Sequence, residues 1–168
     1  MINKIIVKSN SERQTIAIGE ALGEVLCSGD IISLIGDLGC GKTRLAKGVI
    51  SKALEVPIDE INSPSFTIVN RYVGPLTIDH ADLYRVGPGA IEELGLMEIV
   101  DSAGVLLIEW ASQEAPISEY ELRATFASGE EENCRILGFE FRESGTWNRR
   151  LPEVVTRSLV QNCLDESW

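Results

Sequence analysis

The sequence lacks the features that mark secreted, membrane-bound or zinc-stabilised proteins. It contains one histidine in 168 residues, and its four cysteines, Cys27, Cys40, Cys134 and Cys163, show no C-x-x-C spacing. A structural zinc site is therefore not expected. The apolar run near the N-terminus is too short for a signal peptide or a membrane span. We expect a protein of the reducing cytoplasm that does not bind membranes.

Positive charge is also scarce. The chain has 15 Lys and Arg residues against 26 Asp and Glu residues, a net charge of −11 at pH 7. A protein that grips a nucleic-acid backbone by itself needs the opposite balance, because cations must neutralise the phosphates. Any contact with RNA is therefore expected to run through partner proteins. The net negative charge can also simply keep the protein soluble, and composition by itself favours this interpretation over a role in RNA-related partner binding.

No internal repeat or low-complexity linker interrupts the sequence, so we expect one domain over residues 1–168. Alternating apolar residues and turn residues predict strands over 2–8, 31–35, 61–72, 76–85, 105–110, 119–127 and 134–142, the third after an opening turn and the last two as an antiparallel hairpin. Helical spacing predicts a first helix after the capping residues 9–11, with apolar positions Ile16, Ile18, Leu22, Val25 and Leu26. It also predicts helices from about 44 to 54, over 91–96, and after Pro152 with an apolar face of Val154, Val155, Leu159, Val160 and Cys163.

The segment Gly36–Thr43, G-D-L-G-C-G-K-T, fits the phosphate-binding loop (P-loop) pattern G-x-x-x-x-G-K-[ST]. It follows a predicted buried strand and precedes a predicted helix, the context that this motif requires. Its glycines let backbone N–H groups approach phosphate oxygens, and the helix N-terminus adds a partial positive charge. Lys42 is expected to reach the terminal phosphates and the Thr43 hydroxyl to complete a magnesium shell. An accidental Gly-rich turn is the alternative, and the flanking strand and helix disfavour it.

The rest of the P-loop is expected to contact the nucleotide as well. The Cys40 thiol should lie in the phosphate cradle near a helix N-terminus, where thiolates are favoured, and so be alkylated readily. The expected nucleotide-binding positions of the loop are Asp37, Leu38, Gly39, Cys40, Gly41, Lys42 and Thr43.

Two segments after the P-loop helix carry candidate polar groups. Hydroxyl residues at 63–67 can reach a terminal phosphate and its metal, or simply form an Asn-Ser-Pro turn, and spacing does not decide between these. Strand alternation places His80 and Asp82 on the same side. Asp82 is a candidate for orienting an attacking water, whereas His80 is expected to form a structural hydrogen-bonded pair.

The apolar run 105–108 ends in the acid Glu109. A carboxylate at the carboxyl end of a buried parallel strand is where P-loop enzymes hold magnesium, so we favour that role over a turn-capping one. The segment Asp101–Gly104 matches the D-x-x-G pattern of GTP-binding proteins, but it leads directly into this apolar run and is predicted to be a turn. No N-K-x-D guanine-reading motif follows.

Together these motifs resemble the bacterial TsaE (YjeE) family, the ATPase component of the machinery that makes threonylcarbamoyladenosine (t6A) in tRNA. The chain departs from the family pattern at Cys40, usually alanine, at Ser65, usually threonine, and at Ala81, usually an aromatic residue. The resemblance covers most of the chain and rests on G-D-L-G-C-G-K-T at 36–43, S-P-S-F at 63–66, H-A-D-L-Y-R at 80–85, E-E-L-G-L at 92–96 and I-E-W at 108–110.

The resemblance implies an α/β fold, a single P-loop NTPase domain with a mixed sheet flanked by helices. It implies ATP and Mg²⁺ as cofactors, the TsaD and TsaB proteins as partners, and tRNA only indirectly through that complex. Thr43 and Glu109 would hold the metal, and Glu12, near the start of the first helix, would lie close to the nucleotide. The implied catalytic residues are Lys42, Asp82, Glu109 and Trp110.

Two other functional classes remain open at this point. A small-molecule or nucleotide P-loop kinase would need an acceptor pocket and usually an Arg-rich lid, and no such segment is visible in the sequence. A nucleotide-dependent adaptor would bind ATP only to change its partners, without useful turnover. Phosphate release with and without partners separates the three classes.

Overall fold

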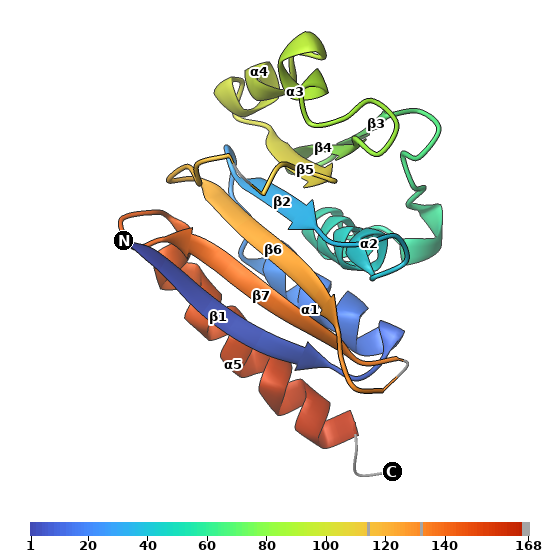
Figure 1. Cartoon of the computed structure of the whole chain (residues 1–168), viewed down its shortest axis with the longest axis vertical. Helices are drawn as coiled ribbons and strands as arrows, with labels where there is room; N and C mark the ends of the chain where they lie inside the picture. Colours follow the sequence, from blue (N-terminus) through green and yellow to red (C-terminus); the bar gives the residue numbers. More distant parts are fainter. Residues whose placement is uncertain (114, 132, 166–168) are drawn as a thin grey trace.

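A computed structural model of the chain describes residues 1–113, 115–131 and 133–165, with side chains placed as far as residue 156. One seven-stranded sheet in the order β1-β7-β6-β2-β5-β4-β3 forms its centre (Figure 1). The strands are β1 Ile2–Ser9, β2 Ile31–Ile35, β3 Val69–Val73, β4 Thr77–Asp82, β5 Val105–Glu109, β6 Glu121–Ser128 and β7 Arg135–Arg142. The helices are α1 Glu12–Glu24, α2 Lys42–Leu54, the 3-10 turn η1 Ile58–Glu60, α3 Ala90–Glu93, α4 Leu96–Asp101 and α5 Trp147–Asp165.

The sheet is mixed, as predicted. Strands β6, β2, β5 and β4 run parallel to one another, while β1 and β6 pair antiparallel with β7 and β3 pairs antiparallel with β4. The predicted hairpin over 119–142 is therefore confirmed. Because parallel strands end at the same edge of a sheet, the P-loop after β2, Asp82 at the end of β4 and Glu109 at the end of β5 meet there. Asp82 and Glu109 are direct register partners.

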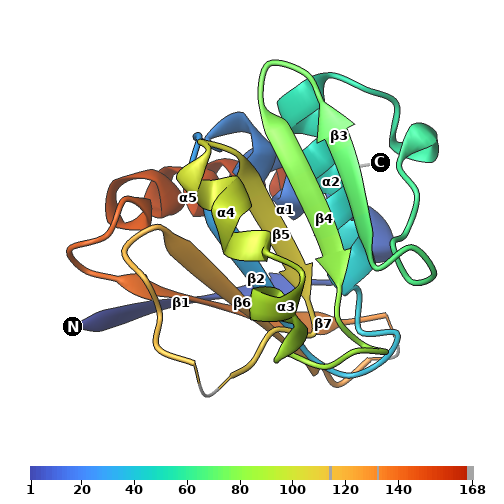
Figure 2. The same cartoon turned by 90° about the horizontal axis from the view of Figure 1, so that it is seen from above.

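Helices cover both faces of the sheet (Figure 2). Helices α1, α2 and α5 pack on one face over the main apolar core, which includes Ile32, Phe139 and Trp147. The short helices α3 and α4 lie on the other face against β5, over a smaller core that includes Leu106. The central parallel strands are apolar on both faces because both are covered. None of the described helices combines the length and the apolar character that a membrane crossing requires.

Glycines bring α1 and α2 into backbone contact. A β-carbon at Gly19 would overlap the Leu45 carbonyl oxygen, and one at Gly48 would overlap the Ile16 carbonyl oxygen. Glycine weakens an isolated helix by about 1 kcal/mol relative to alanine, so these positions favour packing over helix propensity. This close approach places the start of α1 beside the P-loop, where Thr15 Cγ2 would lie 3.6 Å from a β-carbon at Gly41.

Several predicted elements differ in their bounds. The segment 61–72 was predicted to open with a turn and become a strand, and the strand forms at Val69–Val73 after a turn closed by the Ile68 N–H and the Pro64 carbonyl at 2.7 Å. The strand expected over 76–85 ends at Asp82, whose side chain accepts the Tyr84 N–H and turns the chain. The helix expected over 91–96 is split into α3 and α4 at Gly95, which has φ 63°.

The last helix begins five residues earlier than predicted and contains Pro152. Trp147 at its start is fully buried, and its indole Nε1 donates to the Tyr120 carbonyl at 3.0 Å. This anchoring outweighs the one helical hydrogen bond that Pro152 cannot donate. The side chains of Leu159, Val160 and Cys163 lie outside the described residues. The prediction of a turn at Asp101–Gly104 is confirmed, since α4 ends there and β5 follows.

Candidate functional site

A cavity of about 390 Å³ lies at the edge where the parallel strands end. The P-loop, the start of α1, the ends of β4 and β5 and the β6–β7 connection surround it. Its lining comprises Glu12, Thr15, Leu38, Gly39, Cys40, Gly41, Lys42, Thr43, Arg44, Ser65, Asp82, Glu109, Trp110, Asn133 and Arg135. Of the residues predicted for the site, all but Asp37 contribute to this lining.

The P-loop has the backbone conformation that an anion cradle needs. Gly39 and Gly41 have φ 76° and 109°, in the region that favours glycine. Helix α2 begins directly at Lys42, so its first turn presents backbone N–H groups without helical partners at the cavity. Together with the helix dipole, these groups make the loop an anion-binding site.

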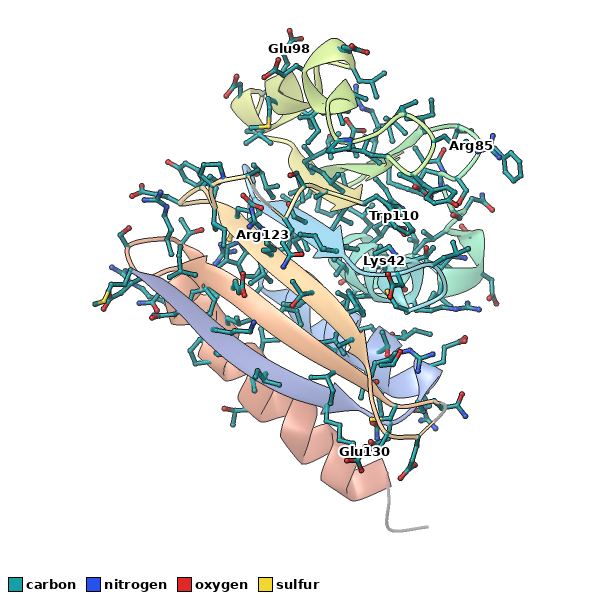
Figure 3. All side chains as sticks on the ribbon, viewed as in Figure 1. Lys42, Arg85, Glu98, Trp110, Arg123 and Glu130 are labelled. Atoms are coloured by element: carbon teal, nitrogen blue, oxygen red, sulfur yellow. The ribbon has the colours of Figure 1, made fainter. Side chains whose placement is uncertain are left out.

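Lys42 is buried in this loop, with 4% of its surface exposed. Its Nζ donates to the carbonyls of Gly36 at 2.7 Å and Asp37 at 2.8 Å, and lies 3.9 Å from the centre of the Trp110 ring. Figure 3 shows Lys42 and Trp110 facing each other from α2 and the end of β5. Asp37 thus contacts Lys42 through its carbonyl, and Trp110 covers the ammonium group with its indole face.

Glu109 and Thr43 meet beneath the P-loop. The Thr43 hydroxyl donates to Glu109 Oε2 at 2.8 Å, and the Glu109 residue is 2% exposed. Glu109 Oε1 is hydrogen-bonded to His80 Nε2, also at 2.8 Å. A hydroxyl and a carboxylate are hard oxygen ligands of the kind that Mg²⁺ prefers, so the two residues fit the predicted metal position. His80 forms the structural pair that the sequence favoured.

Asp82 is held by two donors. Its Oδ2 accepts from the Ser65 hydroxyl at 3.1 Å and its Oδ1 accepts from the Tyr84 N–H at 3.0 Å. Ser65 is in turn hydrogen-bonded to the Ser63 hydroxyl at 2.7 Å. The hydroxyl segment 63–67 therefore reaches the cavity through Ser65. Thr67 instead donates to Asn70 at 2.6 Å.

Glu12 and Thr15, near the start of α1, also line the cavity. Glu12 forms an exposed ion pair with Arg44 at 3.2 Å, and Thr15 is buried and hydrogen-bonded to Ser9 at 2.8 Å. Such an exposed pair contributes little energy, but it places both charges beside the cavity.

Among the cavity residues that were not predicted are Arg44, Asn133 and Arg135. Arg44 follows the P-loop motif, whereas Asn133 lies in the β6–β7 connection and Arg135 begins β7. The acidic segment before Asn133 predicted only a hairpin connection. Its approach to the P-loop depends on how the sheet is assembled and leaves no local signal.

The orientation of the Cys40 side chain corrects the sequence-based expectation. Cys40 is 7% exposed and belongs to the main apolar core. A β-carbon at Gly36 would lie 2.8 Å from its Sγ and 2.9 Å from Phe126 Cβ, so the thiol packs beneath the loop. The thiol is therefore buried within the loop, where the Lys42 ammonium group donates to its Sγ at 3.6 Å, and it is not freely exposed.

Comparison with known proteins agrees with this geometry. The family model described as "Threonylcarbamoyl adenosine biosynthesis protein TsaE" matches residues 9–136. The chain belongs to the TsaE family. The match includes the P-loop, Asp82 and Glu109, so the cavity is the P-loop site of a TsaE protein.

Relatives named tRNA threonylcarbamoyladenosine biosynthesis protein TsaE support this membership. The protein of Nostoc sp. is 38% identical over 109 residues, 61% of this chain and 65% of the relative. The protein of Treponema pallidum is 38% identical over 111 residues, which cover 64% of this chain and 78% of the relative. The protein of Bacillus subtilis is 40% identical over 99 residues, which cover 58% of this chain and 61% of the relative. The matched segment thus spans slightly less than two thirds of the Nostoc and Bacillus relatives.

A solved structure confirms the TsaE-like fold along nearly the whole chain. The crystal structure of YdiB from Bacillus subtilis superposes with a TM-score of 0.69 at 26% identity, covering 96% of this chain and 98% of YdiB. The mixed P-loop sheet flanked by helices is therefore the fold of this family.

Proposed function

We propose that this chain binds ATP with Mg²⁺ and hydrolyses it as a subunit of the t6A machinery, acting with the TsaD and TsaB proteins. The observation that carries the proposal is the contact between Thr43 Oγ1 and Glu109 Oε2 at 2.8 Å, in a cavity that Lys42 and Asp82 also line. These are the groups that phosphoryl transfer needs for a phosphate cradle, a metal position and a water-orienting acid. Family membership supports the assignment to t6A synthesis.

The cavity suits a nucleotide in size and in the order of its groups. Its volume of about 390 Å³ lies within the usual range for small-molecule sites. The P-loop backbone N–H groups bind the phosphates, and Lys42 supplies a positive charge to the terminal ones. Glu12 and Thr15, which line the cavity from α1, lie close to the bound nucleotide.

Thr43 and Glu109 hold the magnesium ion, directly or through its waters. Bound there, Mg²⁺ neutralises negative charge on the phosphates of ATP. Both side chains are oriented without the metal, because the Thr43 hydroxyl donates to one carboxylate oxygen and His80 holds the other. Such preorganisation reduces the reorganisation needed on binding.

Asp82 orients the attacking water. In hydrolysis the water oxygen bonds to the γ-phosphorus, the bond from that phosphorus to the ADP oxygen breaks, and the water proton passes to the released phosphate. Asp82 needs a fixed carboxylate for this role, and Ser65 and the Tyr84 N–H fix it. Lys42, placed by the P-loop carbonyls and Trp110, stabilises the charge that develops on the phosphates.

Turnover by the isolated chain is expected to be slow. An additional cation at the transition state can be worth about a thousandfold or more in P-loop enzymes. Arg71 pairs with Asp79 at 2.7 Å, and Arg85 lies 4.6 Å from the Phe66 ring. Of the two arginines that line the cavity, Arg44 pairs with Glu12 at 3.2 Å and Arg135 donates to the Cys134 carbonyl at 2.8 Å. A partner protein then completes the site. The net charge of −11 favours docking to a protein over direct binding of tRNA.

Phosphate release tests the proposal in three mixtures: the chain alone, the chain with TsaB and TsaD, and the same complex with tRNA. We expect slow release alone and a change of at least about tenfold in the complete mixture. Release at about one per second or faster by the chain alone would favour an independent enzyme such as a kinase. Nucleotide-dependent binding to TsaB and TsaD without phosphate release would favour an adaptor.

A further inference from the structure

His80 is the single histidine of the chain and lies completely buried in β4. It does not line the cavity, but its Nε2 lies 2.8 Å from Glu109 Oε1. Strand geometry explains the contact. His80 precedes Asp82 by two residues and so points to the same side of the sheet, and its register partner on β5 is Leu107, two residues before Glu109. The imidazole therefore contacts the Glu109 carboxylate from the buried side, away from the cavity.

The two oxygens of Glu109 have separate partners. His80 on β4 holds Oε1, and Thr43 on α2 donates to Oε2. This division fixes the rotation of the carboxylate, because each oxygen is tied to a different element. Oε2 consequently faces the P-loop, while Oε1 faces the interior of the sheet.

The proposed metal role also implies which nitrogen of His80 donates. A metal-holding Glu109 is ionised and its oxygens can only accept hydrogen bonds, so this role requires a proton on His80 Nε2. His80 Nδ1 has no hydrogen-bond partner among the described residues. A proton on Nδ1 would be an unpaired donor in the core, which is more costly than a bare nitrogen lone pair.

We propose that His80 is a positioning residue that holds Glu109 Oε1 and thereby presents Oε2, with Thr43, to magnesium. The inference rests on the proposed function, in which Glu109 holds the metal. Without a donor at position 80, Oε1 would be a buried acceptor with no partner, and the carboxylate would be free to rotate. Loss of a residue that orients a metal ligand typically costs about 10- to 100-fold in metal affinity or activity.

Proton NMR of protein labelled with ¹⁵N-histidine tests the His80–Glu109 bond without nucleotide or metal. Because the chain has one histidine, every imidazole signal belongs to His80. We expect a proton on Nε2 and a displaced Nε2 proton signal in Glu109→Ala. A bare Nε2, or signals unchanged by Glu109→Ala, would overturn the inference.

Calorimetry with a non-hydrolysable ATP analogue tests the positioning role. The quantity compared is the gain in affinity on replacing EDTA with Mg²⁺. We expect His80→Phe to reduce this gain about tenfold or more and to leave affinity in EDTA unchanged. His80→Gln places an amide N–H near the Nε2 position and should restore the gain, whereas His80→Asn places it near the Nδ1 position and should not.

The variants also separate positioning from a merely structural role. If His80→Phe does not fold, the Gln and Asn variants decide, with thermal unfolding in EDTA as the measure of stability. The positioning role would be overturned if Mg²⁺ raised the affinity of His80→Phe or His80→Asn for the ATP analogue as much as it does in the wild type. An equal loss of affinity in Mg²⁺ and in EDTA would also overturn it. A wild-type chain with no magnesium gain would overturn both this role and the proposed metal site, while the NMR result on the hydrogen bond would stand.

Discussion

Lys42 makes close contacts within its own loop before any ligand binds. Its ammonium group is bound by the carbonyls of Gly36 and Asp37 and covered by Trp110. Trp110 itself has φ 63°, a conformation that costs a non-glycine residue about 1–3 kcal/mol. The fold thus accepts strain at Trp110 in an arrangement that holds the lysine at the phosphate site.

Replacing this lysine tests its role in binding. We expect Lys42→Ala to weaken ATP binding by at least about tenfold, because a hydrogen bond to a charged group contributes roughly 1.5–3 kcal/mol. Calorimetry measures the affinity. Lys52→Ala is the matched control, since Lys52 lies on the same helix but pairs with Glu24 at the surface. Unchanged affinity in Lys42→Ala would exclude the phosphate-binding role.

Glu109 is expected to affect turnover more than nucleotide binding. Its carboxylate contacts Thr43 and His80 rather than the backbone of the P-loop. Glu109→Ala should lower magnesium-dependent phosphate release by about a hundredfold or more and leave ATP affinity in EDTA largely unchanged. Glu98→Ala, on α4 at the other face of the sheet, is the control. Normal turnover without Glu109 would move the metal role elsewhere, with Asp82 the next candidate.

The cysteines differ in reactivity because they differ in exposure. Cys27 is exposed, whereas Cys40 and Cys134 are buried. We expect a thiol reagent to label Cys27 well before Cys40 in the folded chain, because a buried thiol must be uncovered first. Peptide mass spectrometry over time measures this order, with Cys134 as a second buried thiol for comparison. Labelling of Cys40 as fast as Cys27 would contradict the packing beneath the P-loop.

At the residue scale, sequence predicted the groups that lie within or next to a motif. The P-loop pattern identified Lys42 and Thr43, and the buried strand ending in an acid identified Glu109. It did not predict Asn133 and Arg135, because their distance from the P-loop depends on the assembled sheet. It also overestimated the exposure of the Cys40 thiol, because burial in the main apolar core is a tertiary effect.

At the scale of helices and strands, the contact between α1 and α2 gives a stability prediction. Gly48→Ala gains about 1 kcal/mol of helix propensity, but its β-carbon meets the Ile16 backbone, which cannot move aside alone. Overpacking of about 1–3 kcal/mol should therefore prevail and lower the melting temperature by several degrees. Gly89→Ala is the control, because Gly89 has φ −64° and no neighbour where the β-carbon would lie. Equal melting temperatures in the two variants would refute the close contact.

Elements with a clear apolar period were predicted correctly. Their first and last residues were predicted less accurately. The alternation in β6 and β7 is local, and both strands formed close to the expected residues. The start of α5 at Trp147 was missed because burial of that side chain against the Tyr120 carbonyl is a tertiary effect. The start of β3 at Val69 was not predicted, because a turn at Pro64–Ile68 satisfies the backbone before it.

At the scale of the whole molecule, the first and last strands of the described chain pair with each other in the sheet. β1 pairs only with β7 among the described strands, and that pairing joins Ile2 to Arg142 and Ser9 to Arg135. The P-loop side of the sheet is different, since β2, β4 and β5 all lie between residues 31 and 109. The P-loop, Asp82 and Glu109 therefore come from a continuous middle part of the sequence, to which α1 and the start of β7 add further cavity residues.

This pairing has a consequence for synthesis on the ribosome. Translation at about 5–20 residues per second leaves β1 without its neighbour for roughly 7 to 27 s, until β7 has been made. During that interval the first strand is an unpaired apolar segment, open to association with other chains. Pulse-labelled hydrogen exchange during refolding should show protection of β2 and β5 amides before those of β1, since distant pairings form late. Earlier protection of β1 would mean that the first and last strands pair first and that the nucleotide-binding edge forms last.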